Sequence, residues 1–240
     1  MSYQGARGTR TRRRPGCLVT GLIVVVVLLV GLDFAARAVA ESVMAKKIQQ
    51  QGLTNKPSVD IGGFPFLTQV ASKNFHQVSI SDTNQVAGPV TITSFSAQAS
   101  SIKLNSFAFS SGTIGSLHGT ALISFASLGN TLAQKIGPLG SLLNGAGLNL
   151  SAAGPDEVKA SLNLLVVSGS AVWRVSRLSG DRLNIRLVSS DGLPASLLGS
   201  MQDVTLQIPK LPLGLTIDSF SVTSAGVVGD ISGQNVPFGT

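Results

Sequence analysis

Few side chains in this sequence could carry out catalysis. The two histidines, His76 and His118, belong to none of the HExxH, HxH or GxSxG patterns that hold a metal or activate a nucleophile. Asp156 and Glu157 are the only adjacent carboxylates, and they lie in a predicted turn that indicates solvent exposure rather than acid–base chemistry. The single cysteine, Cys17, precedes the body of the chain, so no disulfide or zinc cluster can form there. We therefore expect no enzyme, and a protein without a metal or cofactor.

The positive charge of the chain is concentrated at its N-terminus. Five arginines precede Pro15, whereas from Glu41 onward 12 basic residues face 10 acidic ones. A body so close to neutral gains little from counterion release, which excludes nucleic acid as its main partner. The chain is also 43% hydrophobic and only 12% charged, which is unusual for a soluble protein.

An apolar run follows this basic tail. Residues 17–32, CLVTGLIVVVVLLVGL, would cover about 24 Å as a helix, between a signal-peptide core and a membrane span of about 30 Å. Residues 38–40 form an A-x-A cleavage pattern, but the helical spacing of Asp33, Arg37 and Glu41 continues through it. We favour an uncleaved anchor over a cleaved signal peptide. The expected organisation is a basic cytoplasmic tail (1–16), a signal anchor or signal peptide (17–40) and an exported domain (41–240).

Beyond about residue 52 the sequence predicts strands separated by turns. Apolar and polar residues alternate in QVSISD, PVTITSF, RLNIRLV and DVTLQI, with the period of two that half-buried strands have. Residues 121–147 instead contain apolar side chains at helical spacing, and Gly137-Pro138 ends that predicted helix. The C-terminal segment predicts an edge punctuated by prolines, followed by two more strands.

All four arginines of the body lie on one predicted hairpin with the only tryptophan. Gly180-Asp181 predicts a two-residue turn. With that turn, one face would carry Trp173 together with Arg177, Arg182 and Arg186. This face is either the wet side of an amphipathic sheet or a membrane contact, with guanidinium groups on lipid phosphates and the indole at the interface.

The segment GGFPFLTQV, residues 62–70, places two phenylalanines around a proline in a chain that has few aromatics. The two glycines permit backbone angles closed to other residues, and Pro65 fixes its own φ, so Phe64 and Phe66 belong to a stiff apolar turn. Either the rings plug the end of the domain's own core, or they line or gate the mouth of a lipid cavity.

The run PSVDIGGFPFLTQV, residues 57–70, after an exported N-terminal helix, resembles the signature of the LmeA-like family of bacterial cell-envelope proteins. LPLGL at 211–215 and GQNVPF at 233–238 stand where that family has a similar motif and a terminal strand. The resemblance covers roughly residues 33–240. It implies an α+β fold similar to the tubular lipid-binding proteins, in which an elongated, curved antiparallel sheet wraps one or two apolar helices.

The resemblance also implies a function. The chain would bind, or bind and transport, a phospholipid or a related envelope glycolipid in an apolar cavity, and would support cell-envelope biogenesis. The expected lipid contacts are Phe64, Phe66, Leu67, Leu211 and Leu213. The expected location is the outer face of the cytoplasmic membrane or a periplasm-like space, with the N-terminus in the cytoplasm if the helix is not cleaved. The alternative is a ligand-free structural or adhesion domain of the envelope, which would show a filled core and an exposed flat sheet.

Overall fold

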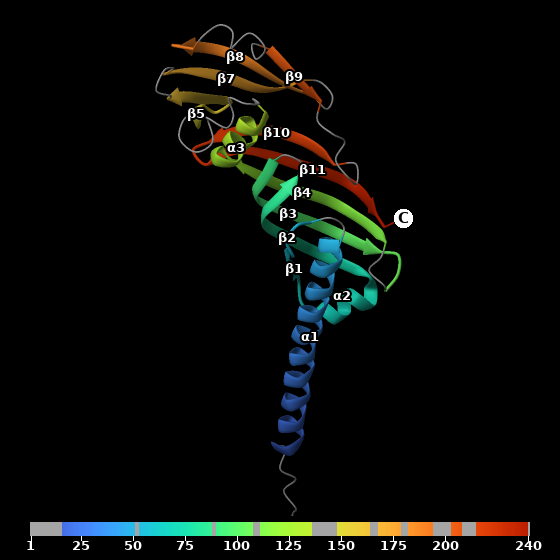
Figure 1. Ribbon diagram of the computed structural model, residues 1–240. Coiled ribbons are helices and arrows are strands. Elements are labelled where there is room, and N and C mark those ends of the chain that lie inside the picture. The colour runs from blue at the N-terminus through green and yellow to red at the C-terminus, as the bar shows by residue number, and fades with distance from the viewer. Residues whose placement is uncertain are drawn as a thin grey trace, which may run out of the picture.

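The computed structural model describes residues 16–50, 53–87, 90–107, 111–135, 148–163, 168–178, 182–193, 203–207 and 215–239. The chain forms a long N-terminal helix, two antiparallel sheets and two shorter helices (Figure 1), which confirms the α+β class. The elongated sheet implied by the family resemblance is divided into two sheets. The helices are α1 (Gly16–Gln50), α2 (Phe66–Ser72) and α3 (Phe125–Lys135).

The six-stranded sheet, called the large sheet below, lies next to α1. In spatial order its strands are β1 (Ser58–Gly62), β2 (Asn74–Ala87), β3 (Val90–Leu104), β4 (Gly112–Ser124), β11 (Gly226–Phe238) and β10 (Thr216–Thr223). The small sheet consists of β5 (Leu148–Gly154), β6 (Glu157–Asn163), β7 (Ser168–Leu178), β8 (Arg182–Asp191) and β9 (Asp203–Gln207). The two C-terminal strands predicted from the sequence are therefore confirmed, and β11 pairs with β4 inside the large sheet.

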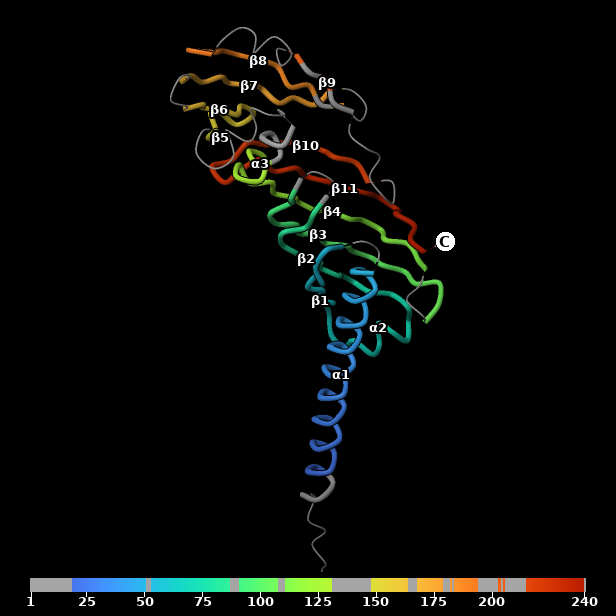
Figure 2. The backbone as a smooth tube through the Cα atoms, viewed as in Figure 1, coloured from blue at the N-terminus to red at the C-terminus, as the bar shows by residue number. Residues whose placement is uncertain are grey.

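The helix α1 has two different halves. Residues 19–32 expose their apolar side chains, and Figures 1 and 2 show this half projecting away from the sheets. Among the described residues it belongs to the one helix long and apolar enough to cross a membrane, a test that a signal sequence also passes. From Asp33 onward the helix packs on the body, with Ala45 buried and Ala36, Ala40, Met44 and Ile48 against the core. The part of α1 that packs against the core therefore begins near residue 33.

The main core lies between α1, α2 and one face of the large sheet, called the inner face below. In β1, Val59 and Ile61 are buried while Ser58 and Asp60 are exposed, as the period of two requires. The buried members of this core are Ala45, Val59, Ile61, Phe66, Phe75, Val78, Ala99 and Ile102.

Strand register extends the inner face beyond α1. Ile80 pairs with Ala97, Ala97 with Gly119 and Gly119 with Ile231, so these residues form one apolar row across four strands. The next row along the strands shows the opposite face, which is polar and rich in hydroxyl groups: Ser81, Ser96, Thr120 and Asp230. The large sheet is therefore apolar on one face and polar on the other.

Strand pairing in the large sheet is interrupted along one transverse line. The register skips the pairs that would join His76, Ser101, Gly115 and Asn235. Ser101 and Asn235 have positive φ values of 54° and 49°. Irregular pairing of this kind kinks a strand locally. Because the kink re-aims side chains, Phe75 and Val78, on either side of it in β2, are both buried on the inner face.

The register of the arginine hairpin differs from the expected one. Leu178 pairs with Arg182 and Arg174 with Arg186, so three residues separate the last paired positions instead of two. A slip of one residue moves every side chain of a strand to the other face. Arg182 and Arg186 therefore share a face with Arg174, and only Arg177 shares one with Trp173. The predicted face assignment is wrong, although the two strands are confirmed.

The small sheet joins the large one through backbone contacts and α3. The N–H of Val222 in β10 donates to the carbonyl of Pro155, which lies between β5 and β6, at 2.7 Å. The helix α3 packs against β3, β4 and β5. The helix predicted within residues 121–147 is confirmed for Phe125–Lys135, whereas residues 121–124 continue β4 and Gly137-Pro138 lies outside the described residues.

Candidate functional site

The two phenylalanines of the GGFPF turn point to different surroundings. Phe66 is 3% exposed and packs against Phe75, with ring centroids 6.1 Å apart. Phe64 is 62% exposed and stacks on Phe34 of α1, at 6.2 Å between centroids and 26° between ring planes. Leu67 is 44% exposed. The burial of Phe66 favours the core-plug interpretation for that ring, whereas Phe64 and Leu67 are accessible to a ligand or surface.

The carboxylate of Asp33 fixes this turn to α1. Its Oδ2 accepts a hydrogen bond from the Phe66 N–H at 2.8 Å, and its Oδ1 accepts one from the Leu67 N–H at 2.7 Å. The N-cap residue of α2 is Pro65, whose side chain makes no capping bond, so a carboxylate from another helix satisfies the first N–H groups of α2. Asp33 is 5% exposed. Its spacing in the sequence puts Asp33 on one helical face with Arg37 and Glu41, called the polar stripe below, but that spacing does not reveal the capping role.

The rest of the polar stripe binds α1 to the edge strand β1. The Nε of Arg37 lies 2.8 Å from Glu41 Oε1, and its Nη2 lies 2.7 Å from Asp60 Oδ2. Glu41 Oε1 also accepts the N–H of Ile61 at 2.9 Å. Together with Asp33, these contacts make the second half of α1 a structural part of the body.

Both histidines lie on strands of the large sheet, His76 in β2 and His118 in β4. The buried side chain of Gln69 donates to the Gly62 carbonyl at 3.1 Å and accepts from the His76 N–H at 3.1 Å, while its oxygen lies 3.2 Å from His76 Nδ1. His118 is exposed on the polar face of the large sheet. Within the described ranges, no three His, Cys, Asp or Glu side chains are grouped to hold a metal ion.

Gly63 makes the turn possible, which leads to a stability prediction. Its φ is +92°, and a Cβ at this position would lie 2.8 Å from Gln69 Nε2. We expect Gly63→Ala to lower the free energy of unfolding by about 1–2 kcal/mol, measured by denaturant titration of the full chain in detergent micelles. Gly62→Ala is the matched control, because its Cβ would meet Gln77 Cβ at an ordinary 3.4 Å. An equal loss in both variants would contradict the role given to Gly63.

The inner face beyond α1 is apolar, with small residues along the central strands. Ala97 and Gly119 face each other across β3 and β4, and Ala121 and Gly229 do so across β4 and β11. Phe95, Ala121, Phe220 and Ile231, which surround these positions, are only half-buried. The small sheet also has an apolar face, formed by the buried Leu150, Ala160 and Ala171 and the half-buried Val158, Trp173 and Val175. Apolar surface is thus available on both sheets.

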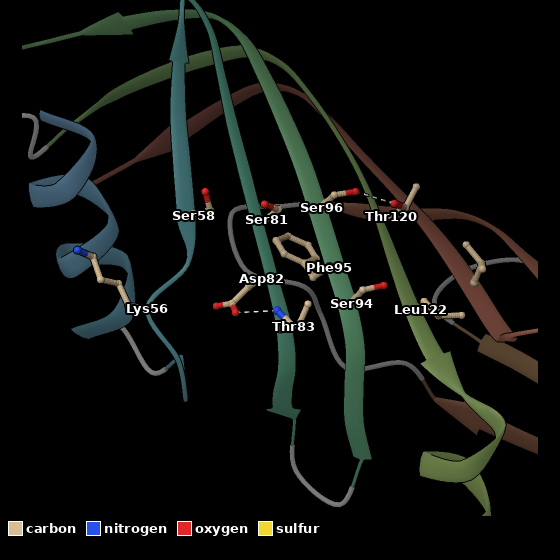
Figure 3. Close-up of a pocket in the computed structure, with 11 residues that line it drawn as sticks. Lys56, Ser58, Ser81, Asp82, Thr83, Ser94, Phe95, Ser96, Thr120 and Leu122 are labelled. Carbon is tan, nitrogen blue, oxygen red and sulfur yellow. Dashed lines mark hydrogen bonds between the residues drawn. The ribbon is translucent and has the colours of Figure 1, made fainter. Parts of the chain in front are cut away.

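A groove of about 560 Å³ crosses β1 to β4 and reaches β11. Figure 3 shows hydroxyl groups from successive strands along it, including Ser96 Oγ and Thr120 Oγ1, which lie 2.9 Å apart. Eight of its eleven lining residues are polar or charged, unlike the Phe and Leu lining expected for a lipid cavity. The lining residues are Lys56, Ser58, Ser81, Asp82, Thr83, Ser94, Phe95, Ser96, Thr120, Leu122 and Val228.

The residues expected at lipid headgroups lie at the end of the molecule opposite the projecting half of α1 (Figure 1). Trp173 is half-buried, and Arg177 is exposed and donates to the Asp218 carbonyl at 3.1 Å. Arg182 and Arg186 are exposed on the other face, beside Arg174, which pairs with Asp156 and Glu157. Leu211 and Leu213, expected to contact lipid, lie outside the described residues.

Comparison with known proteins gives the relationships of the chain. The family described as LmeA-like phospholipid-binding matches residues 31–232. Uncharacterized proteins of Mycobacterium bovis and of two Mycobacterium tuberculosis strains are 26% identical over 242 residues, spanning 96% of this chain and 67% of each relative. No solved structure matches the chain. Because the family match covers most of the sequence, the chain belongs to the LmeA-like phospholipid-binding family.

Proposed function

We propose that the chain binds a phospholipid or a related envelope lipid without catalysing a reaction, and so supports cell-envelope biogenesis. In this proposal the acyl chains lie against the inner face of the large sheet beyond α1. The observation that carries the proposal is the family match over residues 31–232. Its physical support is an apolar face that the described helices cover only in part, with Phe95, Phe220 and Ile231 half-buried.

The free energy of such binding comes from the burial of apolar surface rather than from specific polar contacts. Each CH₂ group removed from water contributes about 0.8 kcal/mol, so a few carbons held against the inner face suffice for stable binding. The small side chains Ala97, Gly119 and Ala121 allow an acyl chain to approach the backbone closely. The polar groove lies on the opposite face of the same strands, so it takes no part in holding the acyl chains.

The proposal includes α1 as an uncleaved anchor. Cleavage before Glu41 would remove Asp33, which caps α2, and Arg37, which pairs with Asp60. It would also remove Ala36 and Ala40, which pack against the core. The basic tail before residue 16 favours a cytoplasmic N-terminus, and therefore a body outside the cytoplasmic membrane.

A pair of adjacent substitutions tests the lipid site. Ala121 lies on the inner face and Thr120 on the polar face of the same strand. We expect Ala121→Trp to displace about three CH₂ groups and to weaken lipid binding roughly fiftyfold, whereas Thr120→Trp leaves binding unchanged. The measurement is mass spectrometry of solvent extracts from the full chain, purified in detergent. Because α1 is identical in both variants, lipid bound around this helix contributes equally to the two measured lipid contents.

Folding of both variants is checked by circular dichroism, and Ala121→Leu replaces Ala121→Trp if the larger side chain prevents folding. Equal lipid content in two folded variants would contradict the proposed site. Lipid at background level in the unmodified chain would favour the alternative function, a ligand-free structural or adhesion domain.

A further inference from the structure

We propose that the base of the body is a lipid-surface docking site. Four apolar side chains form it, and we call them the basal patch: Phe34, Phe64, Leu67 and Phe107. The occupant is the interface of the membrane that α1 crosses, so the inference rests on the anchoring part of the proposed function. It assigns to the exposed half of the GGFPF turn contact with a bilayer rather than with a lipid held inside the domain.

The exposure of the basal patch is the first observation. Phe34, Phe64, Leu67 and Phe107 are 56%, 62%, 44% and 59% exposed. Large apolar side chains gathered on one surface indicate a protein or membrane contact, whereas single ones scattered over a surface do not.

The members of the patch lie along α2. Phe64 precedes the first turn of α2 and stacks on Phe34 of α1. At the other end of α2, the Lys73 carbonyl accepts the N–H of Leu104, which brings the end of β3 and the following Phe107 to this helix. The Lys73 ammonium lies 4.7 Å from the centre of the Phe107 ring. The exposed Leu67 lies between these two ends.

Continuity with α1 identifies the occupant as a bilayer. Leu32, the last residue of the projecting apolar half, is 60% exposed, and Phe34 follows it closely on the same helix. Asp33, between them, is buried because it binds the backbone of α2. The carboxylate therefore holds the GGFPF turn directly beside the point where the apolar half of α1 ends.

The charge around the patch suits a membrane surface. Residues 61–81 contain no Asp or Glu, and Lys73 is their only lysine or arginine. Aromatic rings and a nearby ammonium are the groups enriched where proteins meet lipid headgroups. The docking would fix the orientation of the body on the membrane and hold the small sheet, with Trp173, away from it (Figure 1).

Depth-dependent fluorescence tests the docking. The full chain is reconstituted in vesicles of phosphatidylcholine and phosphatidylglycerol, with or without phosphatidylcholine brominated on its acyl chains. Phe64→Trp and Phe107→Trp are made in a Trp173→Phe background. We expect brominated lipid to lower their emission about twofold or more, because interfacial apolar groups reach the acyl boundary. Val188→Trp, at a 46% exposed position of β8, is the matched control and is expected to change little.

The unmodified chain, in which Trp173 is the only tryptophan, is a second control and is also expected to change little. Equal quenching in Phe64→Trp, Phe107→Trp and Val188→Trp would overturn the inference, as would strong quenching of Trp173 in the unmodified chain.

Flotation at alkaline pH separates the two proposals. A chain that floats with the vesicles but is not quenched at the base contradicts docking alone, and a chain that does not float contradicts both docking and anchoring.

Discussion

Replacing Phe66 with alanine is expected to lower the free energy of unfolding by about 3–5 kcal/mol. The ring is 3% exposed and packs against Phe75 within the core shared by α1, α2 and the large sheet, so its removal leaves a cavity. The same substitution at Phe64 is expected to cost no more than about 1 kcal/mol, since most of that ring is already in contact with solvent. Denaturant unfolding of the full chain in detergent micelles measures both values.

The two variants form a matched pair, because the same side chain is truncated two residues apart in one turn. If Phe64→Ala destabilised the protein as much as Phe66→Ala, the assignment of one ring to the core and the other to the surface would be contradicted. The bound lipid of both variants, measured in parallel, tests whether Phe64 contributes to the lipid site itself. A sharp loss of lipid in stable Phe64→Ala would support the mouth of the site, and full retention would leave docking as its role.

The stiff turn could be predicted from the sequence, but the placement of its rings could not. Glycine and proline restrict or release local backbone angles, so GGFPF indicates a turn without any knowledge of the fold. Which ring is buried depends on α1 and β2, which approach the turn only in the folded chain. The same holds for Asp33, whose hydrogen-bond partners, Phe66 and Leu67, lie more than 30 residues away.

The arginine hairpin shows where local patterns are insufficient. The alternation of apolar and polar residues located both strands of the hairpin, because this pattern depends only on which residues face the core. The sheet face on which each arginine lies depends on the length of the connection between β7 and β8. One extra residue in this connection moved Arg182 and Arg186 to the other face.

The sequence pattern also could not predict which distant strands pair with each other. The C-terminal strand β11 pairs with β4, so Gly229 and Ile231 complete the apolar rows of the inner face. No period of two within β11 specifies this neighbour. The proposed lipid surface therefore arises from register between strands that are distant in the sequence, and it could not be assembled from any one segment.

Asp33 provides the test of how strongly α1 is coupled to the body. We expect Asp33→Ala to lower the free energy of unfolding by about 3 kcal/mol, because it removes two hydrogen bonds to a charged group at about 1.5 kcal/mol each. The N–H groups of Phe66 and Leu67, at the start of α2, would lose their acceptor. Asp33→Asn is expected to cost less, since its amide oxygen can still accept one of the two bonds. Denaturant unfolding in detergent micelles measures each variant.

Asp60→Asn is the matched control for this carboxylate. The Asp60 side chain is 66% exposed and pairs with Arg37, so the loss expected is below about 1 kcal/mol. A loss for Asp33→Asn no larger than that for Asp60→Asn would contradict the capping role. If the role holds, Asp33→Ala also reduces quenching of the Phe64→Trp variant by brominated lipid, because the turn is no longer held beside the apolar half of α1. Stability and membrane depth would then both depend on one buried carboxylate.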